Sequence, residues 1–156
     1  MNKQKQLSPE TYIRTRARNL PIDKCFINQN WKETGIASII VSRKHTNGNF
    51  TFGVYLVDLF ALGTKDSFYR FNTAPDILEE LKERMSKELV EEADYVLVHN
   101  IIYGANAYAE ENGFKVCKEF ILTQFILEED TEDIELIEIE FGKDGKPLLI
   151  QNVGMF

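Results

Sequence analysis

The chain has 156 residues, of which 44% are hydrophobic and 28% charged, and these values are typical of one globular domain. A net charge of −7 disfavours general affinity for nucleic acid, and two cysteines are too few for the disulfide framework of a small secreted protein. The polar N-terminus lacks the apolar core of a signal peptide, and no apolar run approaches the roughly 20 residues of a membrane span. We therefore expect one cytoplasmic globular domain over residues 1–156, with residues 1–7 as a flexible tail and no membrane partner.

The chain begins with the signals of a short helix. Ser8 can accept a hydrogen bond as the N-cap, Pro9 suits the first helical position, and Glu10 favours the positive end of the helix dipole. Pro21 restricts the residue before it, which predicts that the helix ends near Asn19.

Four runs rich in β-branched and aromatic residues follow, and they predict an antiparallel meander. The sequence Asn47-Gly48 separates the second run from the third, and this pair is typical of a two-residue hairpin turn of type I′. A second turn is expected at residues 63–66. The predicted strands cover residues 25–27, 36–44, 50–62 and 67–71.

The second half of the chain predicts helices and then another hairpin. Apolar residues recur at helical spacing after Pro75 and again over residues 94–112, where Gly113 is expected to end the helix. Residues 118–127 fit a helix or a strand, and a short helix is favoured. The remaining predicted elements are a loop over 128–133 and a hairpin with strands 135–141 and 147–151 around a turn at 143–146. Strands grouped before helices favour an α+β fold. We expect an antiparallel sheet built from the N-terminal meander and the C-terminal hairpin, packed on one face by two to three helices.

Charge is distributed unevenly along the chain. Residues 1–24 carry six basic and two acidic side chains, a net of +4, whereas residues 128–140 carry eight acidic side chains and no basic one. Both runs are typical of solvated surface. An alternative interpretation is that they contact each other, within one molecule or between two.

The sequence contains none of the short motifs that identify common enzyme and cofactor sites. Glycine loops for dinucleotides or phosphates, paired-cysteine and HExxH metal motifs, and the serine-hydrolase elbow are all absent. Cys25 follows Lys24, which would favour its thiolate, but it begins an apolar strand, where cysteine is typically a small buried hydrophobe. No cofactor and no resident metal are expected.

A polar stripe is predicted on the second long helix. His99, Tyr103, Asn106 and Glu110 are spaced by four, three and four residues, which places all four on one side of the helix. An imidazole, a phenol, an amide and a carboxylate in a row could bind a small ligand or transfer a proton. The alternative is an ordinary solvent-exposed helix face.

Two further groups of polar residues have a functional and a structural interpretation. The predicted hairpin tip contains His45 and Asn47, which can contact a partner or simply stabilise a tight turn. Asp58 lies inside an apolar strand, where a carboxylate is costly unless it is bonded or at an edge. If His45 and His99 lie close to Asp58 in space, the three could form a metal site or an acid–base pair, with Asp66 orienting it.

Several segments carry a resemblance to other proteins. They include Arg18-Asn19-Leu20-Pro21-Ile22, Asn47-Gly48-Asn49, Tyr55-Leu56-Val57-Asp58, His99-Asn100-Ile101-Ile102-Tyr103-Gly104 and Phe141-Gly142-Lys143-Asp144-Gly145-Lys146. Together they resemble a group of uncharacterised bacterial proteins, over roughly residues 16–150. The group has no established activity, so the resemblance implies no catalytic residue. Ala61 stands where the group more often has cysteine, so any chemistry of such a cysteine would be lost in this chain.

The function favoured by the sequence is a non-enzymatic protein-interaction or regulatory domain. Its surface would include the hairpin tip and the polar stripe, and its partner would be another protein or a second copy, since an exposed sheet edge can pair. The alternative is a hydrolase, with or without a metal, that uses His45, Asp58 and His99. A nucleic-acid module, resting on the basic N-terminal helix, is the third hypothesis.

Overall fold

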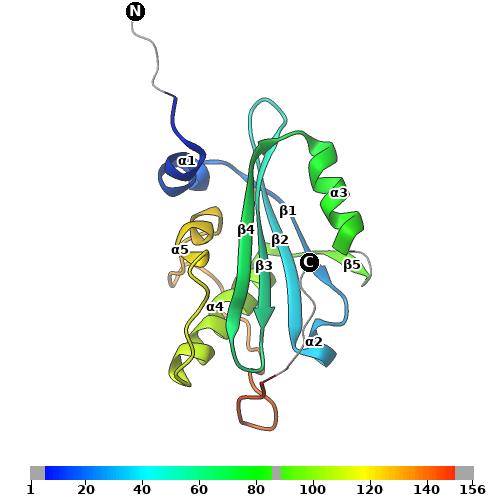
Figure 1. Ribbon diagram of the computed structural model, residues 1–156, viewed down its shortest axis with the longest axis vertical. Coiled ribbons are helices and arrows are strands. Elements are labelled where there is room, and N and C mark those ends of the chain that lie inside the picture. Colours follow the sequence, from blue (N-terminus) through cyan, green and yellow to red (C-terminus); the bar gives the residue numbers. More distant parts are fainter. Residues whose placement is uncertain (1–5, 86–88, 150–156) are drawn as a thin grey trace, which may run out of the picture.

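The computed structural model describes residues 6–85 and 89–149, and the strands in these segments form one five-stranded antiparallel sheet (Figure 1). The order across the sheet is β4-β3-β2-β1-β5, so β4 and β5 are its edge strands. The strands are β1 (Ile22–Asn28), β2 (Ile36–Lys44), β3 (Phe50–Asp58), β4 (Gly63–Thr73) and β5 (Val90–Ala93). The α+β fold with an antiparallel sheet that the sequence predicts is confirmed.

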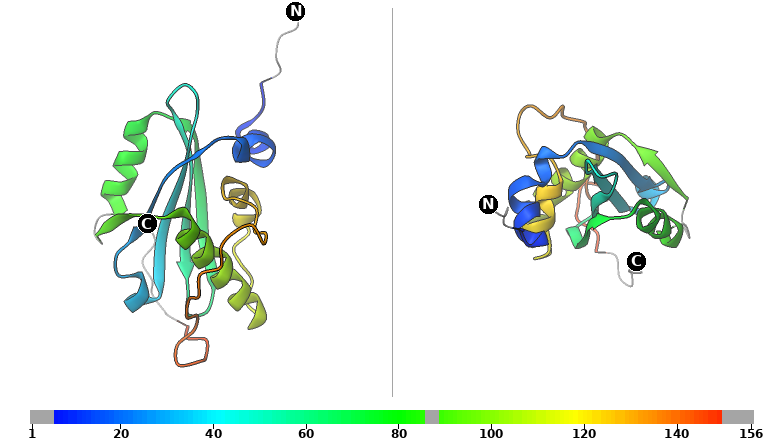
Figure 2. Two further views of the ribbon diagram at one scale, coloured as in Figure 1. Left: turned by 180° about the vertical axis from the view of Figure 1, so that it is seen from behind. Right: turned by 90° about the horizontal axis from the view of Figure 1, so that it is seen from above.

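Helices cover both faces of this sheet (Figure 2). The α-helices are α1 (Pro9–Arg16), α2 (Trp31–Thr34), α3 (Pro75–Met85), α4 (Tyr95–Glu111) and α5 (Phe120–Thr123), and the 3₁₀ turns are η1 (Ala17–Asn19) and η2 (Gln124–Ile126). α3 packs on one face, and α1, α4 and α5 lie on the other, which corrects the expectation that helices cover a single face. The reason is that β3 is buried along almost its whole length, and a strand that is apolar on both sides needs cover on both sides.

The helix ends follow the signals in the sequence. The Ser8 hydroxyl accepts a hydrogen bond from the Thr11 backbone N–H at 3.2 Å, and Pro9 occupies the first turn of α1. Gly113 follows α4 with a φ of 82°, a left-handed conformation that glycine adopts without strain. The short helix predicted near residue 120 is present as α5 and η2.

Two hydrophobic clusters hold the layers together. On the first face, alternate residues of β1, β2 and β3 pack against α4; this cluster contains Ile27, Ile39, Val41, Tyr55, Val57, Val98, Ile101, Ile102 and Ala105. On the second face, the intervening residues of the same strands pack against α3; this cluster contains Phe26, Ile40, Phe52, Val54, Leu78 and Met85. The alternation of strand side chains between the faces separates the two clusters.

The hairpin between β2 and β3 forms as predicted, but its turn is of another type. Gly48 has a φ of 88°, whereas Asn47 does not adopt a positive φ. The Gly48 N–H donates to the His45 carbonyl at 3.0 Å, and the His45 N–H donates to the Asn49 carbonyl at 2.8 Å. This is the pattern of a three-residue loop with glycine in the left-handed position, because a type I′ turn would need positive φ at both central residues.

The predicted C-terminal hairpin does not join the sheet. Within the described part of residues 135–149, the ladder is limited to one bridge between Lys143 and Lys146, which closes the predicted turn. Asn100 of α4 supplies the hydrogen bonds that a neighbouring strand would give: it donates to the Glu135 carbonyl at 2.9 Å and accepts from the Ile137 N–H at 3.0 Å. Residues 150–151 of the predicted return strand, and residues 1–5 of the predicted tail, lie outside the described segments.

One turn, one helix and one strand differ from the elements that the sequence predicts. The turn expected at residues 63–66 lies earlier, at 59–62, and residues 63–66 already belong to β4. Neither α2 nor β5 was predicted. The longest described helix, α4, has 17 residues, and none of the helices in the described segments has the length and hydropathy that crossing a bilayer demands.

Candidate functional site

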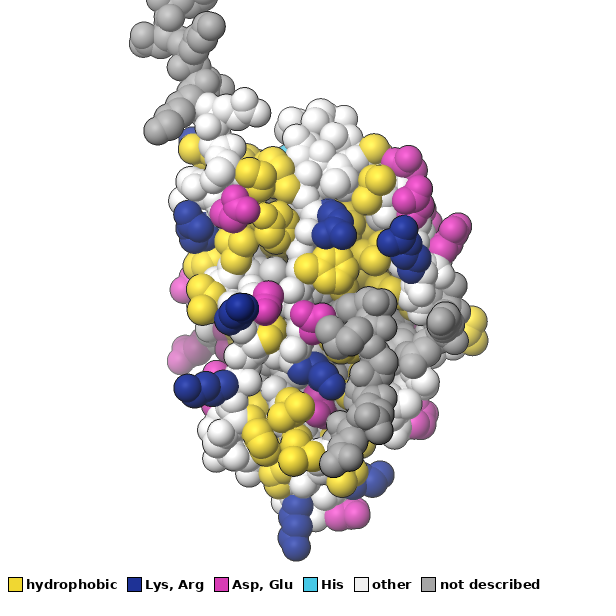
Figure 3. All heavy atoms as spheres, in the orientation of Figure 1, with side chains coloured by type: hydrophobic (Ala, Val, Ile, Leu, Met, Phe, Trp, Pro, Cys, Tyr) yellow, Lys and Arg dark blue, Asp and Glu magenta, His cyan; other side chains and the backbone are white. Residues whose placement is uncertain are grey.

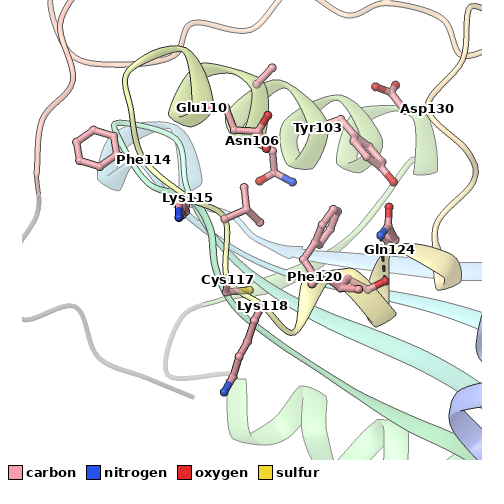
Figure 4. A pocket seen from close by; sticks show the side chains of 13 residues that line it. Tyr103, Asn106, Glu110, Phe114, Lys115, Cys117, Lys118, Phe120, Gln124 and Asp130 are labelled. Atoms are coloured by element: carbon pink, nitrogen blue, oxygen red, sulfur yellow. Dashed lines mark hydrogen bonds between the residues drawn. The ribbon is translucent and has the colours of Figure 1, made fainter.

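A pocket of about 680 Å³ lies between α4 and the segment 114–124 that returns antiparallel to it (Figure 4). Tyr103, Asn106 and Glu110 of the predicted polar stripe line one wall. Phe120 and Gln124 belong to the opposite wall. The structure therefore brings three of the four stripe residues to one concave site.

Asn106 is held in place by an unusually close approach of α4 to β4. Its Oδ1 accepts a hydrogen bond from the Thr64 backbone N–H at 2.7 Å, and the residue is only 6% exposed. A Cβ at Gly63 would lie 2.9 Å from that Oδ1 and 3.1 Å from the Ala105 carbonyl oxygen, and Gly63 also has a φ of 64°. Glycine is therefore required at this contact. Because the bond to Thr64 fixes the amide, Nδ2 of Asn106 is directed toward the pocket (Figure 4).

Tyr103 presents a neutral phenol to the same pocket. Its ring packs against His99, with centroids 4.6 Å apart, and edge-on against Phe120 at 5.8 Å. Burial raises the pKa of Tyr103 to about 12, so the hydroxyl stays protonated at neutral pH. Figure 4 shows this hydroxyl pointing across the pocket toward the Gln124 side chain.

His99 does not reach the pocket, because both ring nitrogens are engaged beneath it. The Tyr95 hydroxyl accepts from the Glu128 backbone N–H at 2.7 Å, and its own proton is then directed to Nδ1 of His99 at 2.7 Å. In the neutral imidazole, Nε2–H is left to donate to Oδ1 of Asp130 at 3.0 Å. His99 is 1% exposed and positions Asp130 at the pocket rim; the stripe is thus partly buried and is not an ordinary exposed helix face.

The two cysteines are weak nucleophiles in this environment. Cys117 lines the pocket, and burial raises the pKa of its thiol. Burial also raises the pKa of Cys25, to about 12, and Cys25 packs in the α4-face cluster. Since the thiolate is the reactive form, neither residue is activated for nucleophilic catalysis.

The three residues considered for a hydrolase are not brought together. His45 follows the Lys44–Phe50 pair at one end of the β2–β3 ladder, whereas Asp58 ends β3. At a rise of roughly 3.4 Å per residue, the length of β3 places them roughly 27 Å apart along the strand. The nitrogens of His99 bind Tyr95 and Asp130, neither of which belongs to that set. Within the described segments, no three His, Cys, Asp or Glu residues cluster as metal ligands would.

Each hairpin residue has a local structural role. His45 Nε2 lies 2.6 Å from the Thr51 hydroxyl, and partial burial lowers the pKa of the ring. Asn47 Oδ1 accepts from the Asn49 N–H at 2.9 Å, and its Nδ2 donates to Oδ1 of Asn72 at 3.3 Å. The bond between Asn47 and Asn49 is typical of a tight turn, and the bond to Asn72 joins the turn to β4.

Asp58 caps the turn that follows β3. Its Oδ1 accepts from the backbone N–H groups of Phe60 at 2.9 Å and Ala61 at 3.2 Å, while Oδ2 is buried and has no hydrogen-bond partner within the described residues. Burial raises the pKa of Asp58. Asp66, suggested as its orienting residue, instead accepts from the N–H of Ser67 at 2.9 Å.

A buried arginine that the sequence analysis did not single out anchors the chain just after the pocket wall formed by residues 114–124. Arg43 of β2 is 1% exposed and donates to the carbonyls of Ile126 and Leu20, both at 2.6 Å, and to Glu128 Oε1 at 3.1 Å. The sequence contains a signal for this burial, because strand alternation places Arg43 on the same face as the apolar residues Ile39 and Val41.

The basic N-terminal run contacts the backbone just before the acidic run. Arg18 donates to the carbonyls of Leu127 at 2.9 Å and Gln124 at 3.3 Å. Among the described residues, no ion pair links residues 6–24 to residues 128–140.

Comparison of the chain with protein-family models, curated proteins and solved structures finds no match. No relative therefore assigns a role to Tyr103 or Asn106. What the pocket binds has to be inferred from its own chemistry.

Proposed function

We propose that this chain is a non-enzymatic protein-interaction domain of the cytoplasm, and that it binds a short peptide segment of a protein partner in the pocket between α4 and residues 114–124. The observation that carries the proposal is a pair of neutral hydrogen-bonding groups directed into a pocket that is lined by both apolar and charged side chains. Within the described part of the chain, the Tyr103 hydroxyl and Nδ2 of Asn106 have no hydrogen-bond partner.

A peptide suits these groups because it offers both backbone and side-chain partners. The Tyr103 hydroxyl and the Asn106 amide can donate to peptide carbonyls. Gln124 Nε2 donates to the Ile121 carbonyl at 2.9 Å, and its Oε1 accepts no hydrogen bond from the described residues, so it is available as an acceptor. Phe120 offers an aromatic wall for an apolar side chain. Pockets that combine apolar walls with a few placed polar groups are typical binding sites.

Binding is favoured over catalysis by the state of the groups that face the pocket. The phenol of Tyr103 and the thiol of Cys117 both have pKa values raised by burial, which keeps them protonated and weak as bases or nucleophiles. His99, the most suitable proton carrier nearby, is buried with both nitrogens bonded. The acidic and basic groups at the rim, Glu110 and Lys115, suit recognition of a charged peptide end or side chain.

The proposal is tested with a displayed library of random twelve-residue peptides selected on the purified chain. Peptides that bind the pocket are expected to lose affinity about fivefold to tenfold for Tyr103→Phe, since this change removes one neutral hydrogen bond and keeps the ring. Fluorescence anisotropy with the selected peptides measures the change. Tyr12→Phe, the same change in α1, is the matched control and should bind like the wild type.

Two results would contradict the proposal. One is a selection that enriches no peptide. The other is a set of peptides whose affinity is the same for the wild type, for Tyr103→Phe and for Tyr12→Phe.

A further inference from the structure

The outer edge of β4 is not paired with another strand of the sheet. β4 pairs with β3 on one side only, because it is an edge strand (Figure 1). Its first residues are covered, since the Cys117 N–H donates to the Thr64 carbonyl at 3.0 Å. At Ser67, Tyr69 and Phe71, no other described element forms a backbone hydrogen bond with the outer side. Such an edge can accept another strand unless something occupies it.

Two of these edge groups are capped by the strand's own side chains. Asp66 Oδ1 accepts from the Ser67 N–H at 2.9 Å, and the Arg70 guanidinium donates to the Tyr69 carbonyl at 3.0 Å. The backbone groups of Ser67 and Tyr69 therefore point away from β3. Because the direction alternates along a strand, those of Asp66, Phe68 and Arg70 point toward β3.

We propose that β4 pairs with β4 of a second copy of this chain, antiparallel and around a two-fold axis at Phe68. In this register Ser67 lies opposite Tyr69 of the second copy, so the Ser67 N–H and the Tyr69 carbonyl, now held by side-chain caps, bond to each other across the interface. The pair exchanges both backbone hydrogen bonds, as outward-facing residues of an antiparallel ladder do.

Charge complementarity selects the second copy and this register. Once released from capping, Asp66 lies directly opposite Arg70 of the second copy, and the two-fold axis repeats the pair on the other side. Opposite charges at facing positions of neighbouring strands attract, and like charges repel. Since both members of each pair belong to β4, a second copy supplies what the edge lacks without any other partner.

The space beside β4 accommodates the added strand. A groove of about 740 Å³ runs between β4 and α5, lined by Tyr69 and Phe71 on one side and Ile121 and Leu122 on the other. Ile121 is 70% exposed and presents an apolar side chain to this groove. Figure 3 shows hydrophobic side chains gathered in the upper half of this face, where α1, α5 and β4 meet. In the proposed register, Tyr69 of the second copy enters this groove.

The two-fold axis makes the assembly closed. Each copy uses the same edge, so pairing ends at a ten-stranded sheet and does not propagate. The proposed dimer interface shares no residue with the pocket between α4 and residues 114–124 except at α5 and the residues next to it. Dimerisation can therefore be tested independently of peptide binding.

Analytical ultracentrifugation of the wild type and of charge variants tests the proposal. The wild type should dimerise with increasing concentration, and Arg70→Glu or Asp66→Lys should each weaken the dimer roughly tenfold, because two attractive pairs become repulsive. The double variant Asp66→Lys/Arg70→Glu restores opposite charges and should recover most of the affinity. Arg84→Glu, the same reversal on exposed α3, should have no effect.

Cysteine crosslinking tests the register. Across an axis at Phe68, the Cα atoms of the two Phe68 residues should be about 4.5 Å apart, a separation that a disulfide can span. In a Cys117→Ser background, Phe68→Cys should form a disulfide dimer rapidly under mild oxidation, and Arg70→Cys should not.

The proposal is overturned if the wild type is monomeric at every concentration, if it forms open-ended oligomers, or if the charge variants dimerise like the wild type. A dimer in which Arg70→Cys crosslinks and Phe68→Cys does not overturns the register and with it the charge argument.

Discussion

The two faces of the sheet are held to their helices by different means. On the α3 face, the residues that pack against Leu78 and Met85 are apolar side chains. On the α4 face, the apolar cluster is accompanied by buried polar side chains that donate to backbone carbonyls. Arg43 donates to Ile126 and Leu20, Tyr55 to the Thr123 carbonyl at 2.7 Å, and Asn100 to Glu135.

The cause of this difference is the regularity of what covers each face. α3 satisfies its own backbone through helical hydrogen bonds, so only an apolar stripe has to meet the sheet. The α4 face is also covered by residues 120–139, of which only short helical turns are regular. Buried backbone groups in an irregular segment need side-chain partners, and these partners also fix its position. The pocket wall beside Phe120 is therefore held in place by polar bonds, whereas α3 is held by apolar contact.

The largest expected loss of stability comes from replacing Arg43, the buried arginine on the α4 face. Arg43→Met keeps much of the side-chain volume but removes the donors to the buried Ile126 carbonyl, to the partly buried Leu20 carbonyl and to Glu128. We expect a loss of about 4 kcal/mol in the free energy of unfolding, since each orphaned buried carbonyl costs roughly 1–3 kcal/mol. Urea denaturation followed by circular dichroism measures it. Arg84→Met, at an exposed arginine of α3, should change stability little; equal losses in the two variants would refute the role of Arg43.

A slightly smaller loss of stability is expected from a substitution in the apolar cluster on the α3 face. Leu78→Ala should lower the free energy of unfolding by about 3 kcal/mol, because Leu78 is 5% exposed and its removal leaves a cavity. Leu136→Ala is the matched control, since Leu136 is 87% exposed and should contribute almost nothing. Hydrogen exchange at the Ile137 amide should rise only as global stability falls. A selective rise at Ile137 would contradict the independence of the two faces.

Asn100→Ala should separate the two faces most clearly, because its effect on hydrogen exchange should be confined to the residues that Asn100 contacts. The change removes the bonds to the Glu135 carbonyl and from the Ile137 N–H, and we expect about 2 kcal/mol of destabilisation. The Ile137 amide should exchange faster than amides in β2, in contrast to the uniform change expected for Leu78→Ala. Asn19→Ala, at an exposed asparagine, should leave both stability and exchange unchanged. Uniform exchange after Asn100→Ala would show that residues 135–137 are held by apolar contact alone.

The same contrast explains which elements could be predicted from the sequence. The helices α3 and α4 and the strands β2 and β3 carry periodic apolar patterns, and each was predicted at nearly its observed position. Residues 135–141 also alternate, with Ile137, Ile139 and Phe141 apolar, but alternation reports only that every second side chain is buried. It does not reveal whether a strand or a side chain such as Asn100 satisfies the backbone.

The candidate site was predictable on one wall only. Helical spacing places Tyr103, Asn106 and Glu110 together, because the period of an α-helix relates residues along one chain segment. The opposite wall, with Phe120 and Gln124, depends on how residues 114–124 return beside α4, and no local pattern encodes that return. The hypothesis that His45, Asp58 and His99 meet failed for the same reason, since it required tertiary proximity that spacing cannot supply.

The smallest effect concerns Asp58, a buried carboxylate that forms no ion pair with arginine or lysine within residues 6–85 and 89–149. Burial raises the pKa of Asp58 above that of the unfolded chain, so its contribution to stability is fully present below the ordinary carboxyl pKa of about 4 and is lost as pH rises through the native pKa. Asp58→Asn keeps an Oδ1 acceptor for the N–H groups of Phe60 and Ala61 and removes the titration. In urea denaturation between pH 4 and 7, the stability of the wild type relative to Asp58→Asn should therefore decrease as pH rises. A difference that stays constant, or that grows with pH, would mean that the two backbone bonds to Oδ1 outweigh the cost of burying the charge.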